Sequence, residues 1–542
     1  RIMNDSNIFE QMENAIENNN IKKFEALLSS SNNNLCNSST DFRYSLLMRA
    51  AHCNNKKAVR LLLQTGVDPN ASNIFGHTAL RFALVNKNLD MVNLLLQAGA
   101  DPDYADEVGH TDLMWAVGTK VPDIIDAVFK HSKPSSFNAH LKYAVQNDKW
   151  EAAALLLEHG ADPNISYADD ITLLLKAAKE GSPKLVKLLL KYGADPNVAD
   201  EEGTTPLMVA AGNARKKVVE LLLQYGADPD IPDKNAQTPL MWLAEKPHRL
   251  NREMLKSFKI WGFGEQDEDR KSYLFCMKKV ESITKMLLKK RAVIQIPNTQ
   301  SSLVKASLWG NSCMVKVLLG YCTDSKVLNE ALMKAVSGML HFVADMVIFR
   351  SVDSPLKLHL SSYNETIKLL LEAEASPNVR DELGITAFVK ASQIPAPLEF
   401  FKIFFKFGAD PHAKSLSGTT ALNNAVLVGN VELIMFLLDE YHVDVNACHK
   451  PTGITPLMEA VRNDNEEIVK LLLQHKADAD LKDMEGRTAL IWAAKKKHWK
   501  LISLLLEASG NVLDARDRKG MTALAYARCN GAPDSITFLL SF

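Results

Sequence analysis

The sequence predicts an all-α protein built from a short helical unit that repeats along nearly the whole chain. A Leu-Leu-Leu triplet or a weaker version of it recurs at intervals of mostly 33 to 35 residues, and a Gly-x-Thr-x-Leu motif recurs between the triplets. The composition, with 46% hydrophobic and 23% charged residues, is ordinary for a folded protein. The 542 residues exceed the size at which one core stops growing, and a repeat array escapes that limit.

The triplets mark the second helix of each unit, helix B. They lie at 61–63, 94–96, 155–157, 188–190, 221–223, 369–371, 471–473 and 504–506. At 218–223 the sequence Val-Val-Glu-Leu-Leu-Leu places an apolar stripe on one side of a helix. Gly226 is expected to end this helix in a left-handed cap, and Asp228-Pro229 to start a hairpin that reaches the next unit.

The Gly-x-Thr-x-Leu motif marks the start of the first helix of each unit, helix A. Its copies lie at 76–80, 203–207, 453–457, 486–490 and 520–524. The Thr hydroxyl is expected to cap the helix, and a Pro such as Pro206 suits the first helical position, where its missing N–H costs nothing. A Gly-Ala-Asp-Pro motif follows helix B at 99–102, 160–163, 193–196, 226–229 and 408–411.

These three motifs together resemble the ankyrin repeat, with Met or Ile where the family's Thr-Pro-Leu-His motif carries His. The resemblance covers about fifteen units. It implies an ankyrin-repeat solenoid, in which helix-turn-helix units with β-hairpins stack in a curved array, and it implies a scaffold or adaptor that binds a partner protein in the concave groove.

Departures from the period predict the organisation of the chain. We expect an N-terminal capping repeat at 1–41, a first block of repeats at 42–244, an inserted or decayed repeat at 245–285, short divergent repeats at 286–338, an insertion between helix A and helix B at 339–362, and a second block at 363–542. The insertion at 339–362 is too apolar for a solvated loop and is expected to pack as an extra helix. Hairpin tips are expected to be missing near 131–139 and 320–328.

One position of helix A suggests where a partner binds. The residue before the helix A alanine is aromatic in three consecutive units, at Phe82, Trp115 and Tyr143. Exposed aromatic residues are typical of binding hot spots, although packing between helices is an equal alternative for this position. The hairpins of the same units add Ile74, Phe75, His77, Val108 and His110 to the predicted partner-binding surface.

The sequence contains no signature of a nucleotide-binding loop, a nucleophile with its base, or a metal site. We therefore expect no enzymatic activity, no cofactor and no metal. The net charge of −1 argues against nucleic acid as the partner, and no apolar run reaches the length of a membrane span. Seven unpatterned cysteines indicate a reducing compartment, and we expect a cytoplasmic monomer.

Two alternatives to the scaffold remain open at this stage. The chain ends on an apolar helix B without a polar cap, and its Asn-rich stretches suit a secreted, host-directed effector, so the array can instead target an effector domain outside these residues. Binding of a nucleotide-like ligand would use Lys305, Lys334 and Lys390 on the helix A strip.

Overall fold

The computed structural model describes residues 2–30, 45–106, 109–146, 150–168, 171–245, 267–290, 302–349, 354–508, 513–531 and 539. The chain forms two compact units, Arg1–Glu201 and Glu202–Phe542, and each is a stack of antiparallel helix pairs. The predicted all-α class is confirmed, because in the described residues the strands are confined to one short hairpin and three isolated bridges.

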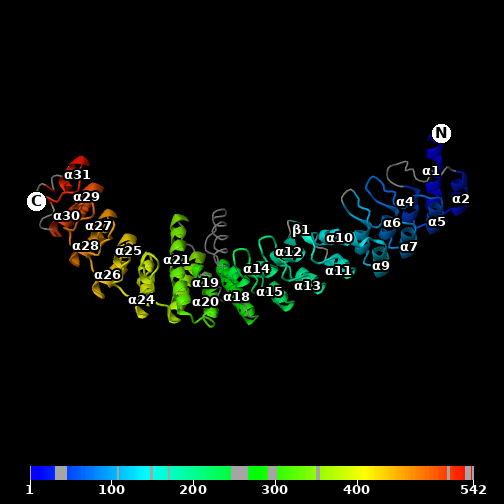
Figure 1. Cartoon of the computed structure of the whole chain (residues 1–542). Helices are drawn as coiled ribbons and strands as arrows, with labels where there is room; N and C mark the ends of the chain where they lie inside the picture. Colours follow the sequence, from blue (N-terminus) through cyan, green and yellow to red (C-terminus); the bar gives the residue numbers. More distant parts are fainter. Residues whose placement is uncertain are drawn as a thin grey trace. The chain divides into compact units, whose positions relative to one another are not determined.

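In the first unit the two helices of each pair lie side by side, with α4, α6 and α8 beside the hairpin loops and α5, α7 and α9 on the other side of the stack (Figure 1). The hairpin pairs Ser166 with Thr172. The elements of this unit are α1 Ile2–Glu17, α2 Ile21–Ser30, α4 Leu46–His52, α5 Lys56–Gln64, α6 Ala79–Val85, α7 Leu89–Gln97, α8 Asp112–Thr119, α9 Pro122–His131, α10 Pro134–Gln146, α11 Trp150–Glu158, β1 Ser166–Ala168, β2 Ile171–Thr172, α12 Leu173–Glu180 and α13 Pro183–Lys191.

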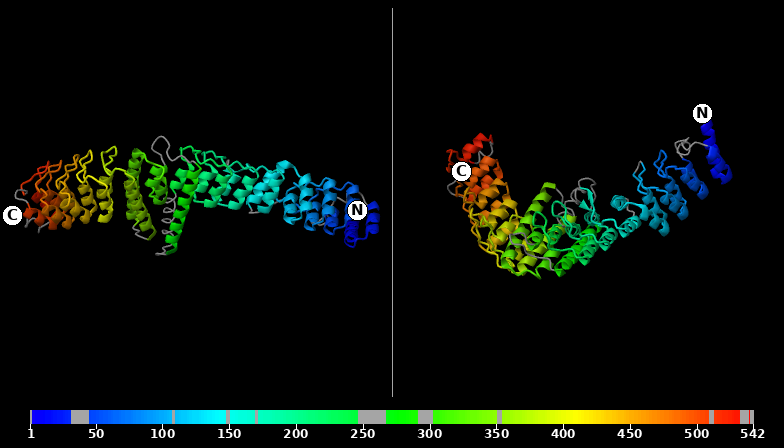
Figure 2. Two further views of the ribbon diagram at one scale, coloured as in Figure 1. Left: turned by 90° about the horizontal axis from the view of Figure 1, so that it is seen from below. Right: turned by 45° about the vertical axis from the view of Figure 1, so that its right-hand side comes forward.

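The second unit continues the same pattern but contains three much longer helices, α18, α21 and α22, which extend beyond the short helices next to them (Figure 2). Its elements are α14 Pro206–Gly212, α15 Lys216–Gln224, α16 Pro239–Ala244, α18 Asp267–Lys289, α19 Ser302–Leu308, α20 Ser312–Leu318, α21 Ser325–Phe349, α22 Ser354–Glu372, α23 Ala387–Ala391, α24 Leu398–Lys406, α25 Ala421–Val428, α26 Val431–Asp439, α27 Pro456–Arg462, α28 Glu466–Gln474, α29 Ala489–Lys496, α30 Trp499–Ala508 and α31 Ala523–Cys529.

The repeats are joined by side chains that bond from one unit to the next. Asn70 shows the pattern: its amide donates to Gly99 O at 3.0 Å, and its carbonyl accepts from Asp101 N at 2.6 Å. Asn378 repeats this bridge to the turn after the next helix B. The apolar faces of helices A and B close the core between these bridges, as residues such as Leu80 and Leu95 are fully buried.

The apolar segment at 339–362 differs from its prediction as a separate helix. Helix α21 runs through to Phe349 and helix α22 begins at Ser354, so the extra residues lengthen helix A and helix B of one unit. Likewise, α18 is one continuous helix over the described part of 245–285 beyond Glu245. Extending an existing helix adds one hydrogen bond per residue and avoids the cost of nucleating a new helix. The predicted domain boundaries themselves stay predictions.

Candidate partner-binding surface

Trp115 is the starting point of the candidate site because its ring is unusually exposed for so large an apolar side chain. It lies on α8, which begins after Thr111, whose hydroxyl accepts from Met114 N at 3.3 Å. The helix buries Leu113 and Ala116, whereas Trp115 is 44% exposed and Gly118, three residues further on, is exposed beside it. Trp115 and Gly118 therefore share the open face of the helix.

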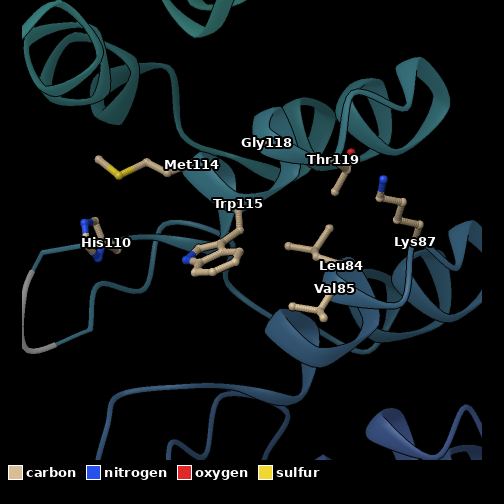
Figure 3. A pocket seen from close by; sticks show the side chains of 8 residues that line it. All are labelled: Leu84, Val85, Lys87, His110, Met114, Trp115, Gly118 and Thr119. Carbon is tan, nitrogen blue, oxygen red and sulfur yellow. The ribbon is translucent and has the colours of Figure 1, made fainter. Parts of the chain in front are cut away.

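A hollow of about 400 Å³ lies beside the Trp115 ring, between α8 and the end of α6. Figure 3 shows the indole with the side chains of Leu84 and Val85 on one side of it and those of His110 and Met114 on the other. Lys87 and Thr119 complete one rim. We call this feature the Trp115 hollow, and it is lined by Leu84, Val85, Lys87, His110, Met114, Trp115, Gly118 and Thr119.

The exposure of Trp115 contrasts with aromatic residues at the same helix A position in the second unit. There a hairpin aspartate accepts a hydrogen bond from the aromatic side chain nine residues later. The pairs are Asp233 with Trp242 Nε1 at 2.9 Å, Asp483 with Trp492 Nε1 at 2.9 Å and Asp517 with the Tyr526 hydroxyl at 2.7 Å. Trp492 is only 7% exposed as a result of this bond and its packing.

Asp106 is the corresponding aspartate for Trp115, but its carboxylate faces other groups. Its Oδ2 lies 3.4 Å from Arg81 Nη1 and 3.7 Å from His110 Nδ1. No residue that the structure describes accepts a hydrogen bond from Trp115 Nε1, and the Asp106 carboxylate instead accepts from Arg81 Nη1 and His110 N. The Trp115 ring therefore lacks the aspartate bond that holds Trp242 and Trp492, and it lies on the surface.

Arg81 belongs to a buried network that the sequence analysis missed. Its Nε donates to Asp112 Oδ1 at 2.5 Å, and Asp112 Oδ2 also accepts from the Thr78 hydroxyl at 2.5 Å. The Arg81 guanidinium lies 5.1 Å from the centre of the Trp115 ring. Burial raises the pKa of Asp112, and the nearby Arg81 charge opposes that rise. The sequence did contain a sign of this network. Arg81 and Asp112 occupy first-turn positions of helix A that are apolar in most other units.

Two residues of the predicted surface, His110 and Tyr143, are joined to each other. His110 Nε2 and the Tyr143 hydroxyl lie 2.6 Å apart, and their rings meet edge to face at 5.4 Å between centroids. Both side chains are half-buried. This pair links the hairpin of one unit to helix α10 of the next, and it places Tyr143 beside the Trp115 hollow as part of its support.

The hairpin before α6 exposes its apolar tip. Ile74 is 49% exposed and Phe75 is 56% exposed. His77, at the base of the hairpin, is half-buried, and its pKa is lowered by burial and by the Arg81 charge. Val108, which was predicted to extend this surface, lies outside the described residues.

Phe82 was predicted to line the surface with Trp115 and Tyr143. The structure corrects this prediction, because the Phe82 side chain is buried. The ring is 9% exposed because His52 meets it edge to face at 5.6 Å and His77 does so at 6.2 Å. Phe82 therefore supports the surface from below. The sequence left packing between helices as an equal alternative for this helix A position. Phe82 and Trp492 are packed in this way.

Two of the three lysines proposed for a nucleotide-like ligand are engaged in contacts within the protein, whereas Lys334 is exposed. Lys305 Nζ lies 2.7 Å from Glu245 Oε1, and Lys390 Nζ lies 3.5 Å from Asp381 Oδ2. Among the described residues, no group of three or more His, Cys, Asp or Glu side chains is placed to hold a metal ion. No helix within the described ranges combines the length and the apolar character that crossing a membrane requires.

Comparison with known proteins gives a consistent family assignment. A family model described as "Ankyrin repeats (3 copies)" matches residues 12–106, 174–260, 388–483 and 475–542. Human ankyrin repeat domain-containing protein 63 is 33% identical over 128 residues, which are 23% of this chain and 33% of that protein. The chain thus spans about a third of that relative.

A putative ankyrin repeat protein of Rickettsia bellii (strain RML369-C) is 32% identical over 157 residues, covering 28% of this chain and 86% of the bacterial protein. Among solved structures, the ankyrin repeat domain of Bcl-3, a member of the IkappaB protein family, is 29% identical with a TM-score of 0.32. That match covers 36% of this chain and 92% of the Bcl-3 chain.

Proposed function

Because this chain belongs to the ankyrin-repeat family, whose repeats are generally protein-interaction modules, we propose that it is a scaffold or adaptor that binds a partner protein through the first unit. The proposed contact surface consists of the hairpin tip at Ile74 and Phe75 and the Trp115 hollow. We call it the Trp115 surface. His110 lines the hollow, and Phe82 and Tyr143 support the surface from behind.

The observation that carries this proposal is the exposure of Trp115. A solvated tryptophan with an available N–H donor costs free energy in the unbound protein, and burial against a partner recovers it. The aspartate that holds the equivalent tryptophan at 492 is present here as Asp106, yet it is bonded to Arg81 and His110 N. The exposure of Trp115 is thus not a general property of this helix A position.

Site-specific photo-crosslinking tests the proposal. Phe75, 56% exposed, is replaced in the full chain by a benzophenone-bearing phenylalanine, which keeps an aromatic side chain at the hairpin tip. The matched control places the same group at Leu416, a hairpin tip of the second unit that is 71% exposed. Both proteins are irradiated in cell extract, and adducts are identified by mass spectrometry.

We expect a discrete adduct from position 75 that is absent from position 416 and is lost when Trp115→Ala is added. Truncating a buried aromatic anchor typically costs 2 kcal/mol or more, roughly thirtyfold in affinity. Identical adducts from both positions, or a position 75 adduct that persists in the Trp115→Ala protein, would place the partner elsewhere.

A further inference from the structure

We propose that the Trp115 hollow receives an acidic peptide segment of the partner, in which a bulky apolar side chain enters the hollow and an adjacent aspartate or glutamate carboxylate binds Lys87. This inference rests on the proposed function, because it names the chemistry of the partner at the Trp115 surface. The shape of the hollow, the charge of its rim and its hydrogen-bonding groups all favour such a segment.

The shape requires an apolar side chain that the protein itself does not supply. Val85 is 55% exposed and Trp115 is 44% exposed, and both face the same space. A Cβ built on Gly118 meets no atom within 4 Å, so the space above this glycine is open. Its volume, about 400 Å³, falls in the range typical of sites that enclose an apolar ligand group.

The charge of the rim favours a carboxylate. Of the described residues that line the hollow, Lys87 carries the formal positive charge and none carries a carboxylate. The other nearby cations are engaged: Arg81 is paired with Asp112, and Lys120 Nζ lies 3.2 Å from Glu151 Oε2. Lys87 forms no ion pair with any residue in the described ranges, so its ammonium is available to a partner.

The same groups disfavour a cationic peptide. An exposed tryptophan can attract a cation to its ring face, but the Arg81 guanidinium already lies 5.1 Å from the ring centre. A second cation would find this place beside the ring taken and would be repelled by Lys87. The Trp115 indole N–H and the Lys87 ammonium are both donors, so an occupant rich in acceptor oxygens matches them.

Selection of peptides on the full chain tests the inference directly. A random-peptide phage library is selected against the 542-residue protein, and enriched peptides are measured against variants by fluorescence anisotropy. Gly118→Leu fills the hollow and should not harm the fold, because the new side chain enters open space and leucine favours a helix more than glycine. Lys179→Leu is the control, since it adds an exposed leucine at the equivalent position of α12.

We expect the enriched peptides to combine Asp or Glu with Leu, Phe or Trp. Their affinity should fall more than about tenfold for Gly118→Leu, whose side chain occupies the apolar site, and stay unchanged for Lys179→Leu. Lys87→Ala should weaken binding about two- to fivefold, the range of an exposed ion pair, and added salt should reduce that difference.

Peptides that need Trp115 and an open Gly118 but are neutral or basic, or are indifferent to Lys87→Ala, would overturn the acidic-peptide inference and leave the proposed surface standing. Peptides that bind the Gly118→Leu and Trp115→Ala proteins as well as the parent would overturn both proposals. Failure to enrich any peptide over the Gly118→Leu protein used as a counter-selection would overturn the inference about the hollow.

Discussion

Arg81 Nε donates a hydrogen bond to Asp112 Oδ1 at 2.5 Å, and the two side chains are 3% and 0% exposed. The bond joins α6 to α8 across the boundary between two repeats. At the equivalent positions of the preceding boundary the chain has Met48 and Ala79, which are both buried and apolar. An ion pair therefore replaces an ordinary apolar contact at the one boundary that also carries the exposed Trp115.

Breaking this pair from one side is expected to destabilise the first unit strongly. Arg81→Met leaves the Asp112 charge buried without its partner, and Asp112→Ala leaves the guanidinium, so each should lower the free energy of unfolding by about 3–5 kcal/mol. The double variant recreates the Met48 and Ala79 combination and should recover most of the loss. Urea denaturation combined with hydrogen exchange of peptides covering α6 and α8 measures this coupling. Additive losses in the double variant would show that the two side chains act independently.

A second prediction concerns Gly338, which lies within α21 at its contact with α19. A Cβ at this position would lie 1.9 Å from Leu308 O, which itself accepts a hydrogen bond from the Tyr363 hydroxyl at 2.9 Å. Gly338→Ala must therefore separate the two helices and break the Tyr363 bond, at a cost of at least the 1–3 kcal/mol typical of overpacking. The midpoint of thermal unfolding should fall.

The matched control for this substitution is Gly118→Ala, another glycine inside a helix. Its added methyl group meets open space, so only the gain in helix propensity, up to about 1 kcal/mol, should remain. The two Gly→Ala changes are expected to shift the unfolding midpoint in opposite directions. A shift of the same sign for both would mean that the close approach of α19 and α21 is not maintained in solution.

Sequence periodicity was sufficient for the fold but not for the exposure of individual side chains. Thr caps such as Thr111 follow from a local motif, so the repeats could be predicted from it. The Asn70 bridge between units was not predicted. Phe82 and Trp115 occupy the same helix A position, yet one is buried beside two histidines and the other is 44% exposed beside Arg81. These differences arise from contacts between neighbouring repeats, which a single repeat motif does not contain.

The lowered pKa of His77 predicts a pH dependence of stability. The unfolded chain binds a proton at the ordinary histidine pKa of 6.5, whereas burial and the Arg81 charge oppose protonation in the folded state, against the weaker attraction of Asp106 and Asp112. As the pH falls below 6.5, the unfolded state binds more protons than the folded state, and stability decreases. His77→Gln should therefore lose less stability than the parent between pH 6.5 and more acidic values. Thermal melts of both proteins across this range measure the difference, and parallel curves would contradict the assignment.

Trp115 and Trp492 provide the final prediction, because they share a helix A position and differ in burial. Trp115→Ala removes a ring that is 44% exposed and one cation–π contact with Arg81, so its cost to stability should stay near 1 kcal/mol. Trp492→Ala removes a ring that is 7% exposed and bonded to Asp483, and a core cavity of this kind costs about 3–5 kcal/mol. Partner binding should respond in the reverse order, with a loss of roughly thirtyfold for Trp115→Ala and none for Trp492→Ala under conditions where that variant is folded.

Tyr225→Ala, which truncates a 41% exposed ring in the second unit, controls for loss of a surface aromatic and should change neither stability nor partner binding. A strong loss of stability in Trp115→Ala with binding intact would instead identify Trp115 as a packing residue.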